Sequence, residues 1–463
     1  MLNGKLPVFD ERTPGYSLFL FSCKAAGLNI NQIFIAQCII SWLVIIYCQF
    51  LISRYTPRYR WIFFLLGIIF YSSAHYINYN TRINPISLFT DFSILTCVLL
   101  IVSAITRKPR HLLLAAFTCW LLILLRPQGF YVLPALALVV AGLSVKREFK
   151  KAASLVVPLA MLLLLLFAYN KATFGNFLFG QYGSRQALGA AVFYLDDTGA
   201  YSPEIKAVIQ KINDSFTDEE REILRGSWSY QELSKVFNVT NWDKVWEFHR
   251  LFKTHSDELR QLGKNSMKQH PDFYLKFIYT NFIYCFLLNR DDYFFYYNEL
   301  VNRKFYIEQS NEFTFMELPE EDYRHTFGEY TDIIRKKSKL TKTGIIRDDD
   351  YTSDFGSEKF LVKLNHYYQI VFAELFSNSL WLWLAALSAG ISAVLVIRSR
   401  LKHDELLLLQ IPLLLVIFNN ILISLSIPPL DGYVFPTRFF LYFYPLSILY
   451  YCLSEYVFFQ ASS

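Results

Sequence analysis

Hydrophobic residues gather in long continuous runs along this chain, and the runs alternate with short polar segments. The apolar runs occupy residues 33–53, 61–77, 85–105, 111–125, 130–143, 155–169, 380–397, 406–427 and 438–458. A helix needs about 20 apolar residues to cross the hydrocarbon core of a bilayer. Several runs are shorter and are bounded by proline, so tilted or broken helices are expected. The pattern predicts an all-α polytopic membrane protein.

Basic residues mark every second connection between these runs. They are Arg54, Arg58 and Arg60, then Arg107, Lys108 and Arg110, then Lys146, Arg147, Lys150 and Lys151, and finally Arg398, Arg400 and Lys402. Because arginine and lysine concentrate in the cytoplasmic loops of membrane proteins, we expect these connections in the cytoplasm. The other connections, and the long polar segment between the sixth and seventh runs, are then expected on the extracytoplasmic face.

The same orientation places residues 1–31 on the extracytoplasmic face, since about nine crossings precede a cytoplasmic C-terminus. No secretory signal sequence precedes Arg12. The apolar stretch 16–28 contains Lys24 and is too short to cross a bilayer. We therefore expect a further transmembrane helix upstream of this sequence in the native protein.

Four regions follow from this pattern. Residues 1–30 are predicted as an outer loop with a juxtamembrane helix, 31–170 as an N-terminal bundle of six spans, 171–367 as a mainly helical extracytoplasmic lobe, and 368–463 as a C-terminal segment of three spans. The second and fourth regions together are expected to form one transmembrane helix bundle.

Within the predicted lobe, residues 218–224 and 242–262 have the apolar spacing of solvated helices. Residues 265–287, with Pro271 followed by several phenylalanines, predict an amphipathic helix. Such a helix either lies on the membrane surface or packs against the lobe itself, and the sequence leaves both interpretations open.

Composition excludes several classes of protein. Of the 463 residues, 54% are hydrophobic and 18% charged, which is too apolar for an ordinary soluble domain. The net charge of +6 comes from short clusters, so nucleic acid is not a predicted partner. The seven cysteines show no CxxC or Cys/His spacing, so neither a disulfide framework nor a zinc site is predicted. The acidic run 348–350 is interpreted as a solvated turn rather than a metal site.

Four charged residues lie inside or at the ends of apolar runs: Asp91, Arg126, Lys171 and Arg438. A charge there costs free energy unless water or a partner compensates it. Asp91 is therefore a catalytic candidate, with structural pairing as the alternative. Arg126 and Arg438 are candidates to hold a lipid phosphate bidentately, and each could instead extend to the headgroups. Lys171 is either a phosphate contact or an interfacial anchor.

The stretch Arg12-Thr13-Pro14-Gly15-Tyr16-Ser17-Leu18-Phe19-Leu20 is a proline-glycine turn that opens a short apolar helix. Just before it, Asp10 and Glu11 are candidates for a general base and a metal ligand, or belong to a solvated terminus. Arg12 is predicted to contact a lipid phosphate. Tyr16 is predicted to line the pocket or an acceptor site, together with Tyr182 and Arg185 from a turn-rich segment over the expected pocket mouth.

Taken in order, these motifs resemble the integral-membrane glycosyltransferases of the GT-C fold, specifically the bacterial relatives of dolichyl-phosphate-mannose protein mannosyltransferases and the lipid A aminoarabinose transferase. The N-terminal stretch is similar to that family's R-x-P-G-Y-P-L-F-L, with Ser17 in place of proline. The other similar segments are Arg126-Pro127, residues 170–179, His270-Pro271-Asp272-Phe273-Tyr274-Leu275, and Arg438-Phe439 with Pro445.

The resemblance implies an inverting transfer of one sugar from a polyprenyl-phosphate donor, undecaprenyl phosphate in a bacterial plasma membrane, to a lipid, glycan or protein acceptor on the extracytoplasmic face. In that family an aspartate of the first outer loop acts as general base, and basic residues hold the donor phosphate. The corresponding span and loop are absent here, so Asp10 is only a substitute for that base. Thr90-Asp91 resembles the family's T-E pair. No cofactor is implied beyond a possible requirement for a divalent cation.

Two other functions stay open at the level of sequence. A transporter or flippase for lipid-linked glycans would carry charges near the bilayer midplane in two related halves, whereas the charges here gather at one face. A catalytically inactive relative of the same family is the other alternative, because the catalytic loop is missing.

Overall fold

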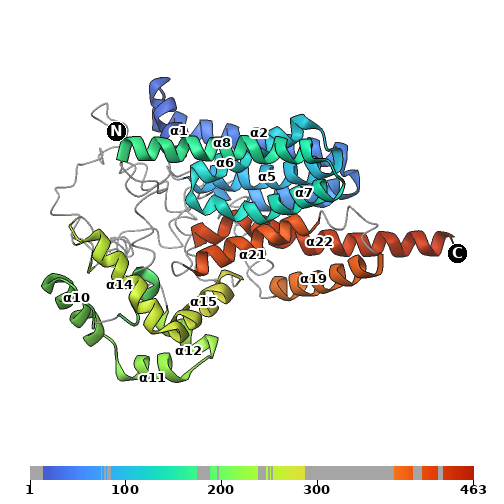
Figure 1. Cartoon of the computed structure of the whole chain (residues 1–463). Helices are drawn as coiled ribbons and strands as arrows, with labels where there is room; N and C mark the ends of the chain where they lie inside the picture. Colours follow the sequence, from blue (N-terminus) through green and yellow to red (C-terminus); the bar gives the residue numbers. More distant parts are fainter. Residues whose placement is uncertain are drawn as a thin grey trace, which may run out of the picture. The chain divides into compact units, whose positions relative to one another are not determined.

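The computed structural model describes residues 14–73, 76–77, 80, 85–174, 188–195, 198–237, 244, 247–248, 251, 254–286, 380–399, 409–425 and 431–462. Every regular element in these ranges is a helix (Figure 1), so the predicted all-α class is confirmed for the part of the chain that is described. The chain divides into two compact units. We call Met1–Gly183 with Tyr284–Phe286 and Ser379–Ser463 the bundle, and Ser184–Ile283 with Leu287–Asn378 the lobe.

The bundle contains the apolar helices of the chain and two short 3-10 turns. They are α1 (Pro14–Ala25), α2 (Ile30–Tyr55), η1 (Pro57–Tyr59), α3 (Arg60–Tyr71), α5 (Ile86–Thr106), α6 (Pro109–Leu125), η2 (Pro127–Val132), α7 (Leu133–Val145), α8 (Phe149–Phe174), α19 (Leu380–Ser399), α21 (Gln410–Ser424) and α22 (Asp431–Ser462).

By length and composition, 4 helical segments among the described residues could cross a membrane: Gln32–Tyr55, Ile86–Thr106, Pro127–Val145 and Phe149–Tyr169. These segments correspond to four of the nine runs predicted from the sequence. The helices over Pro109–Leu125, Trp383–Leu395 and Gln410–Ser424 are apolar but shorter.

Two predicted spans differ from the helices observed. The run 61–77 gives α3, which has 12 residues and ends at Tyr71, a length of about 18 Å. At its end the Ser72 and Ser73 hydroxyls donate back to carbonyls of the preceding turn, Ser72 to Ile68 O at 2.7 Å. The predicted run 438–458 begins too late, since α22 starts at Asp431 and includes Pro436.

Helix α5 is the centre of the bundle and packs against α2, α6, α7, α21 and α22. Most of its side chains are buried around the whole circumference, as expected for a helix that is apolar on every side. Helices α2 and α8 bury a much smaller share of their apolar windows. Figure 1 shows α2, α5, α6, α7 and α8 running side by side.

The lobe is built from short amphipathic helices. They are α10 (Pro203–Asp214), α11 (Asp218–Gly226), α12 (Tyr230–Val236), α14 (Ser256–Gln269) and α15 (Pro271–Phe286). In α10, Ile205, Ile209 and Ile212 recur at helical spacing and are buried. They pack in one apolar core with Leu224, Leu259 and Phe277 from three other helices. The predicted helix 218–224 is confirmed. Of the predicted helix 242–262, the part from Ser256 onward belongs to α14, and eight residues before it lie outside the described residues.

The predicted helix 265–287 is two helices that meet at His270. Proline is favoured at the first position of a helix, where its missing N–H is not needed, so Pro271 starts α15. On α15, Lys276, Phe277 and Thr280 are buried. Packing against the lobe, one of the two interpretations left open by the sequence, is therefore observed for this face.

Candidate functional site

The buried polar side chains of the bundle concentrate at one end. That end contains the beginnings of α2, α5 and α22 and the last turns of α3, α6 and α21. The opposite end holds the basic connections, where Arg107 lies 3.5 Å from Glu148 and the Arg58 guanidinium lies over the Tyr451 ring at 4.8 Å. We call the first of these the polar end of the bundle.

Asp91, on the second turn of α5, lies at the centre of the polar end with 0% of its surface exposed. Its carboxylate accepts hydrogen bonds from three hydroxyls: Ser41 Oγ at 2.6 Å, Tyr71 Oη at 2.9 Å and Tyr76 Oη at 2.7 Å. Hydrogen bonds to an ionised acceptor are among the stronger ones in proteins. These three donors compensate for the loss of solvent around the carboxylate and join α2 and α3 to α5.

Tyr16, on α1, is connected to Asp91 through α2. Its hydroxyl donates to Gln37 Oε1 at 2.7 Å, and Gln37 Nε2 donates to Asn80 O at 3.1 Å. Ser41 Oγ lies 3.0 Å from Gln37 O as well as 2.6 Å from Asp91. Burial, followed by the nearby Cys23 thiol, raises the pKa of Tyr16, so its phenol stays protonated and donates. Two residues predicted for the site therefore belong to one hydrogen-bonded network.

Arg126 caps the C-terminus of α6 in an extended conformation, with φ −152° and ψ 139°. The following Pro127 causes this, because the proline ring excludes the helical conformation from the residue before it. The Arg126 guanidinium lies over the ring of Phe89 at 5.6 Å. Phe89 is also on the first turns of α5, so Arg126 and Asp91 are both placed by the same end of that helix.

Two glycines bring backbone segments into close contact with the end of α6. A Cβ atom on Gly15 would lie 2.6 Å from Leu124 O, and one on Gly129 would lie 2.5 Å from the carbonyl carbon of Leu122. Real Cβ atoms do not approach backbone atoms so closely. The start of α1 and the turn after Arg126 therefore both pack directly on the last turn of α6. The proline-glycine turn and the Arg-Pro motif, far apart in the sequence, lie next to one another.

Arg438 lies about two turns inside α22, with 7% of its surface exposed. The sequence predicted it at the start of a span, so its position is corrected by the earlier start of α22. The adjacent Thr437 accepts a hydrogen bond from Asn419 Nδ2 at 3.0 Å. Asn419 in turn accepts from Gln128, two residues after Arg126. A short polar chain thus connects the segments that carry the two arginines.

The remaining predicted site residues are not part of these networks as described. Lys171 lies exposed in the last turn of α8. Asp10, Glu11, Arg12, Tyr182 and Arg185 lie outside the described residues, so their roles stay predictions.

Several polar residues of this end were missed by the sequence analysis: Gln37, Ser41, Tyr71, Tyr76, Gln128 and Asn419. An unpaired amide inside a bilayer is costly, so Gln37 and the pair Asn419-Asn420, each within an apolar run, carried a signal that could have been used. The serine and tyrosines carried none, since these residues are common in membrane helices and at interfaces.

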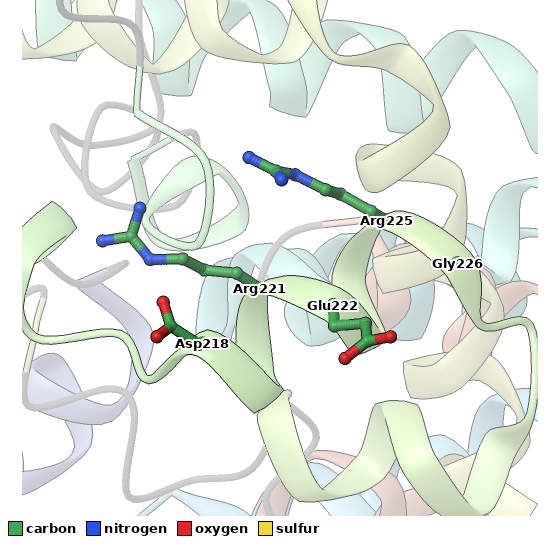
Figure 2. A pocket seen from close by; sticks show the side chains of 5 residues that line it. All are labelled: Asp218, Arg221, Glu222, Arg225 and Gly226. Atoms are coloured by element: carbon green, nitrogen blue, oxygen red, sulfur yellow. The ribbon is translucent and has the colours of Figure 1, made fainter.

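A separate hollow of about 490 Å³ lies on the lobe and contains none of the predicted site residues. Figure 2 shows Arg221 and Arg225 extending from α11 in the same direction, with Asp218 beside Arg221 and Glu222 pointing away. Arg221 donates to the carbonyls of Asn213 and Phe216. Because its exposed acids and bases balance, this hollow has the character of a solvated helix face. Among the described residues, no group of three His, Cys, Asp or Glu side chains could hold a metal ion.

Protein-family models, curated proteins and solved structures yielded no match to this chain. The chemistry available to this chain is therefore inferred from the residues of the polar end. Two guanidinium groups, from Arg126 and Arg438, belong to the polar end of this apolar bundle. A guanidinium offers a planar pair of donors that matches a phosphate group.

Proposed function

We propose that this chain transfers a sugar from a polyprenyl-phosphate-linked donor to an acceptor at the extracytoplasmic face of the membrane, with inversion at the anomeric carbon. The observation that carries the proposal is the convergence of the Arg126 turn, the Thr437-Arg438 segment and the start of α1 on one end of the bundle. Three of the segments on which the family resemblance rests therefore lie at the same end of the bundle.

Arg126 and Arg438 are assigned to the donor phosphate. In the reaction, the acceptor hydroxyl oxygen attacks the anomeric carbon while the bond from that carbon to the phosphate oxygen breaks. The electron pair of this bond leaves with the polyprenyl phosphate, whose negative charge increases. Two cationic groups at the headgroup level stabilise that charge, and a carboxylate takes up the proton of the acceptor hydroxyl.

The identity of that base stays a prediction. Asp91 is enclosed by three hydroxyl donors and has no exposed surface, which favours a role in holding α2 and α3 against α5. A base must come within hydrogen-bond reach of the proton that it removes. We therefore assign proton transfer to Asp10 or Glu11, which precede Arg12 in the sequence.

The test uses the full chain in nanodiscs with undecaprenyl phosphate as the probe. Arg126→Ala and Arg438→Gln are each expected to weaken binding of this lipid about tenfold or more, because a charge-assisted hydrogen bond contributes about 1.5–3 kcal/mol. Arg110→Ala, an exposed arginine at the other end of α6, is the matched control and should bind normally. Native mass spectrometry gives the bound fraction.

Turnover is then followed with a panel of undecaprenyl-phosphate sugars, by release of free undecaprenyl phosphate. Release that depends on both arginines supports sugar transfer. Movement of an intact lipid-linked sugar across the bilayer supports the transporter alternative, and binding without either activity supports an inactive relative. Unchanged lipid binding in both arginine variants contradicts the proposed phosphate site.

A further inference from the structure

The lobe gathers its exposed large apolar side chains in one place. Among its described residues these are Trp228, Leu275 and Tyr279, with 54%, 55% and 38% of their surfaces exposed. The rings of Trp228 and Tyr279 lie 6.3 Å apart in an edge-to-face arrangement, and Leu275 is one helical turn before Tyr279 on α15. We call these three residues the α15 patch. Apolar side chains that are concentrated, rather than scattered, mark a contact surface.

A buried lysine fixes the geometry of the α15 patch. Lys276 is 2% exposed, and its Nζ donates to Leu224 O at 2.7 Å and to Arg225 O at 3.0 Å. The ammonium therefore caps the C-terminus of α11, where its charge is favourable. The same ammonium lies 5.3 Å from the centre of the Trp228 ring, a distance at which a cation and an aromatic ring attract. Trp228 is thus held in an exposed position.

One exposed basic residue, Arg225 at the end of α11, lies close to the patch in the sequence. It lies three residues before Trp228. Figure 2 shows its side chain extending away from α11. Tryptophan and tyrosine concentrate at the level of lipid headgroups, and exposed arginines there pair with anionic phosphates. The composition of this surface fits a membrane interface.

We propose that the α15 patch docks the lobe on a phospholipid surface, with Leu275 against acyl chains, Trp228 and Tyr279 at the headgroup level and Arg225 on a lipid phosphate. This interaction is independent of the sugar-transfer proposal, because it needs neither donor binding nor catalysis. Its role is to keep the lobe beside the bilayer, where any lipid-linked substrate lies.

The test places the photo-crosslinking residue p-benzoylphenylalanine at position 228 or 279 of the full chain, in nanodiscs of phosphatidylethanolamine and phosphatidylglycerol. Both positions exchange one exposed aromatic ring for another, so folding is retained and is checked by size-exclusion chromatography. Gln210, exposed on α10, is the control position. Mass spectrometry after irradiation is expected to show phospholipid adducts at 228 and 279 and none above background at 210.

Adducts at 228 and 279 that join only protein, whether another segment of this chain or a second copy, overturn the proposal, as does the absence of lipid adducts at both positions. Arg225→Glu, in the variant with the crosslinker at position 279, is expected to lower the yield of phosphatidylglycerol adducts. An unchanged yield overturns the part of the proposal that assigns Arg225 to an anionic headgroup.

Discussion

The residue with the most constrained surroundings is Asp91. Its side chain is fully buried among apolar helices, yet all three recorded partners are neutral hydroxyls, from Ser41, Tyr71 and Tyr76. Ser41 can donate its single proton either to Asp91 or to Gln37 O, which lies 3.0 Å away. An amide at position 91 could therefore donate to Ser41 while Ser41 turns its proton to Gln37.

This geometry predicts different results for two substitutions of Asp91. Asp91→Asn should unfold at nearly the same temperature as the unsubstituted chain and keep most of its activity, because the hydrogen bonds can be rearranged. Asp91→Leu should lose about 2 kcal/mol or more, since the hydroxyls of Tyr71 and Tyr76 lose their acceptor at about 1–3 kcal/mol each, whereas Ser41 can still donate to Gln37 O. Thermal unfolding in detergent measures the stability of both variants.

Activity separates the two roles considered for Asp91. If Asp91→Asn folds normally but abolishes sugar transfer, Asp91 acts as the base and the positioning role is wrong. If donor binding and turnover both stay within a few-fold of normal, the carboxylate organises the polar end and another group removes the proton.

At the scale of elements, the contact of α1 with α6 decides whether the N-terminal motif reaches the polar end. This contact depends on Gly15, where no Cβ separates α1 from the Leu124 carbonyl. It depends also on Pro127, which stops α6 so that Arg126 leaves the helix axis. Gly15 and Pro127 thus position the site residues by their backbone geometry and take no part in the chemistry.

Gly15→Ala is expected to displace α1 from α6. The added methyl group would lie 2.6 Å from Leu124 O, and overpacking of this kind costs about 1–3 kcal/mol. Gly142→Ala on α7 is the matched control, because its methyl group would meet nothing within 4 Å. A glycine to alanine change inside a helix should raise stability by about 0.5–1 kcal/mol. Thermal unfolding distinguishes the two, and equal effects at both positions would contradict the packing of α1 on α6.

At the scale of the whole molecule, the bundle has two chemically different ends. The basic connections lie at one end, and the Asp91 network with the two arginines lies at the other. Lys146 follows α7 and Lys171 lies in the last turn of α8, so the length of α8 separates them. The positive-inside rule assigns the first to the cytoplasm and the second to the extracytoplasmic face.

Cysteine labelling tests this orientation in intact cells. A membrane-impermeant maleimide should label Lys171→Cys directly and Lys146→Cys only after the cells are permeabilised. The unsubstituted chain gives the background, which should be low because its described cysteines are buried or partly buried. The opposite pattern would reverse the topology and place the polar end in the cytoplasm, which contradicts transfer on the outer face.

The sequence by itself determined the helical class and the composition of the bundle, because long apolar runs and proline boundaries are local properties that set helix type and end points. Asp91 and Arg126 were identified in the same way, since a charge in an apolar run is visible in one dimension. The start of the last span was predicted too late, at position 438, because Pro436 was interpreted as a helix boundary. In the structure α22 begins at Asp431 and continues through Pro436.

Only the tertiary structure decided which of these residues meet. The hydroxyls around Asp91 come from α2, from α3 and from Tyr76, and the chain from Gln128 to Asn419 and Thr437 joins residues that are far apart in the sequence. No local pattern contains such partners, because hydrogen bonds between helices depend on how the helices are packed. For the same reason the sequence could not assign Trp228 and Tyr279 to one surface, since that pairing follows from the packing of α15 in the lobe.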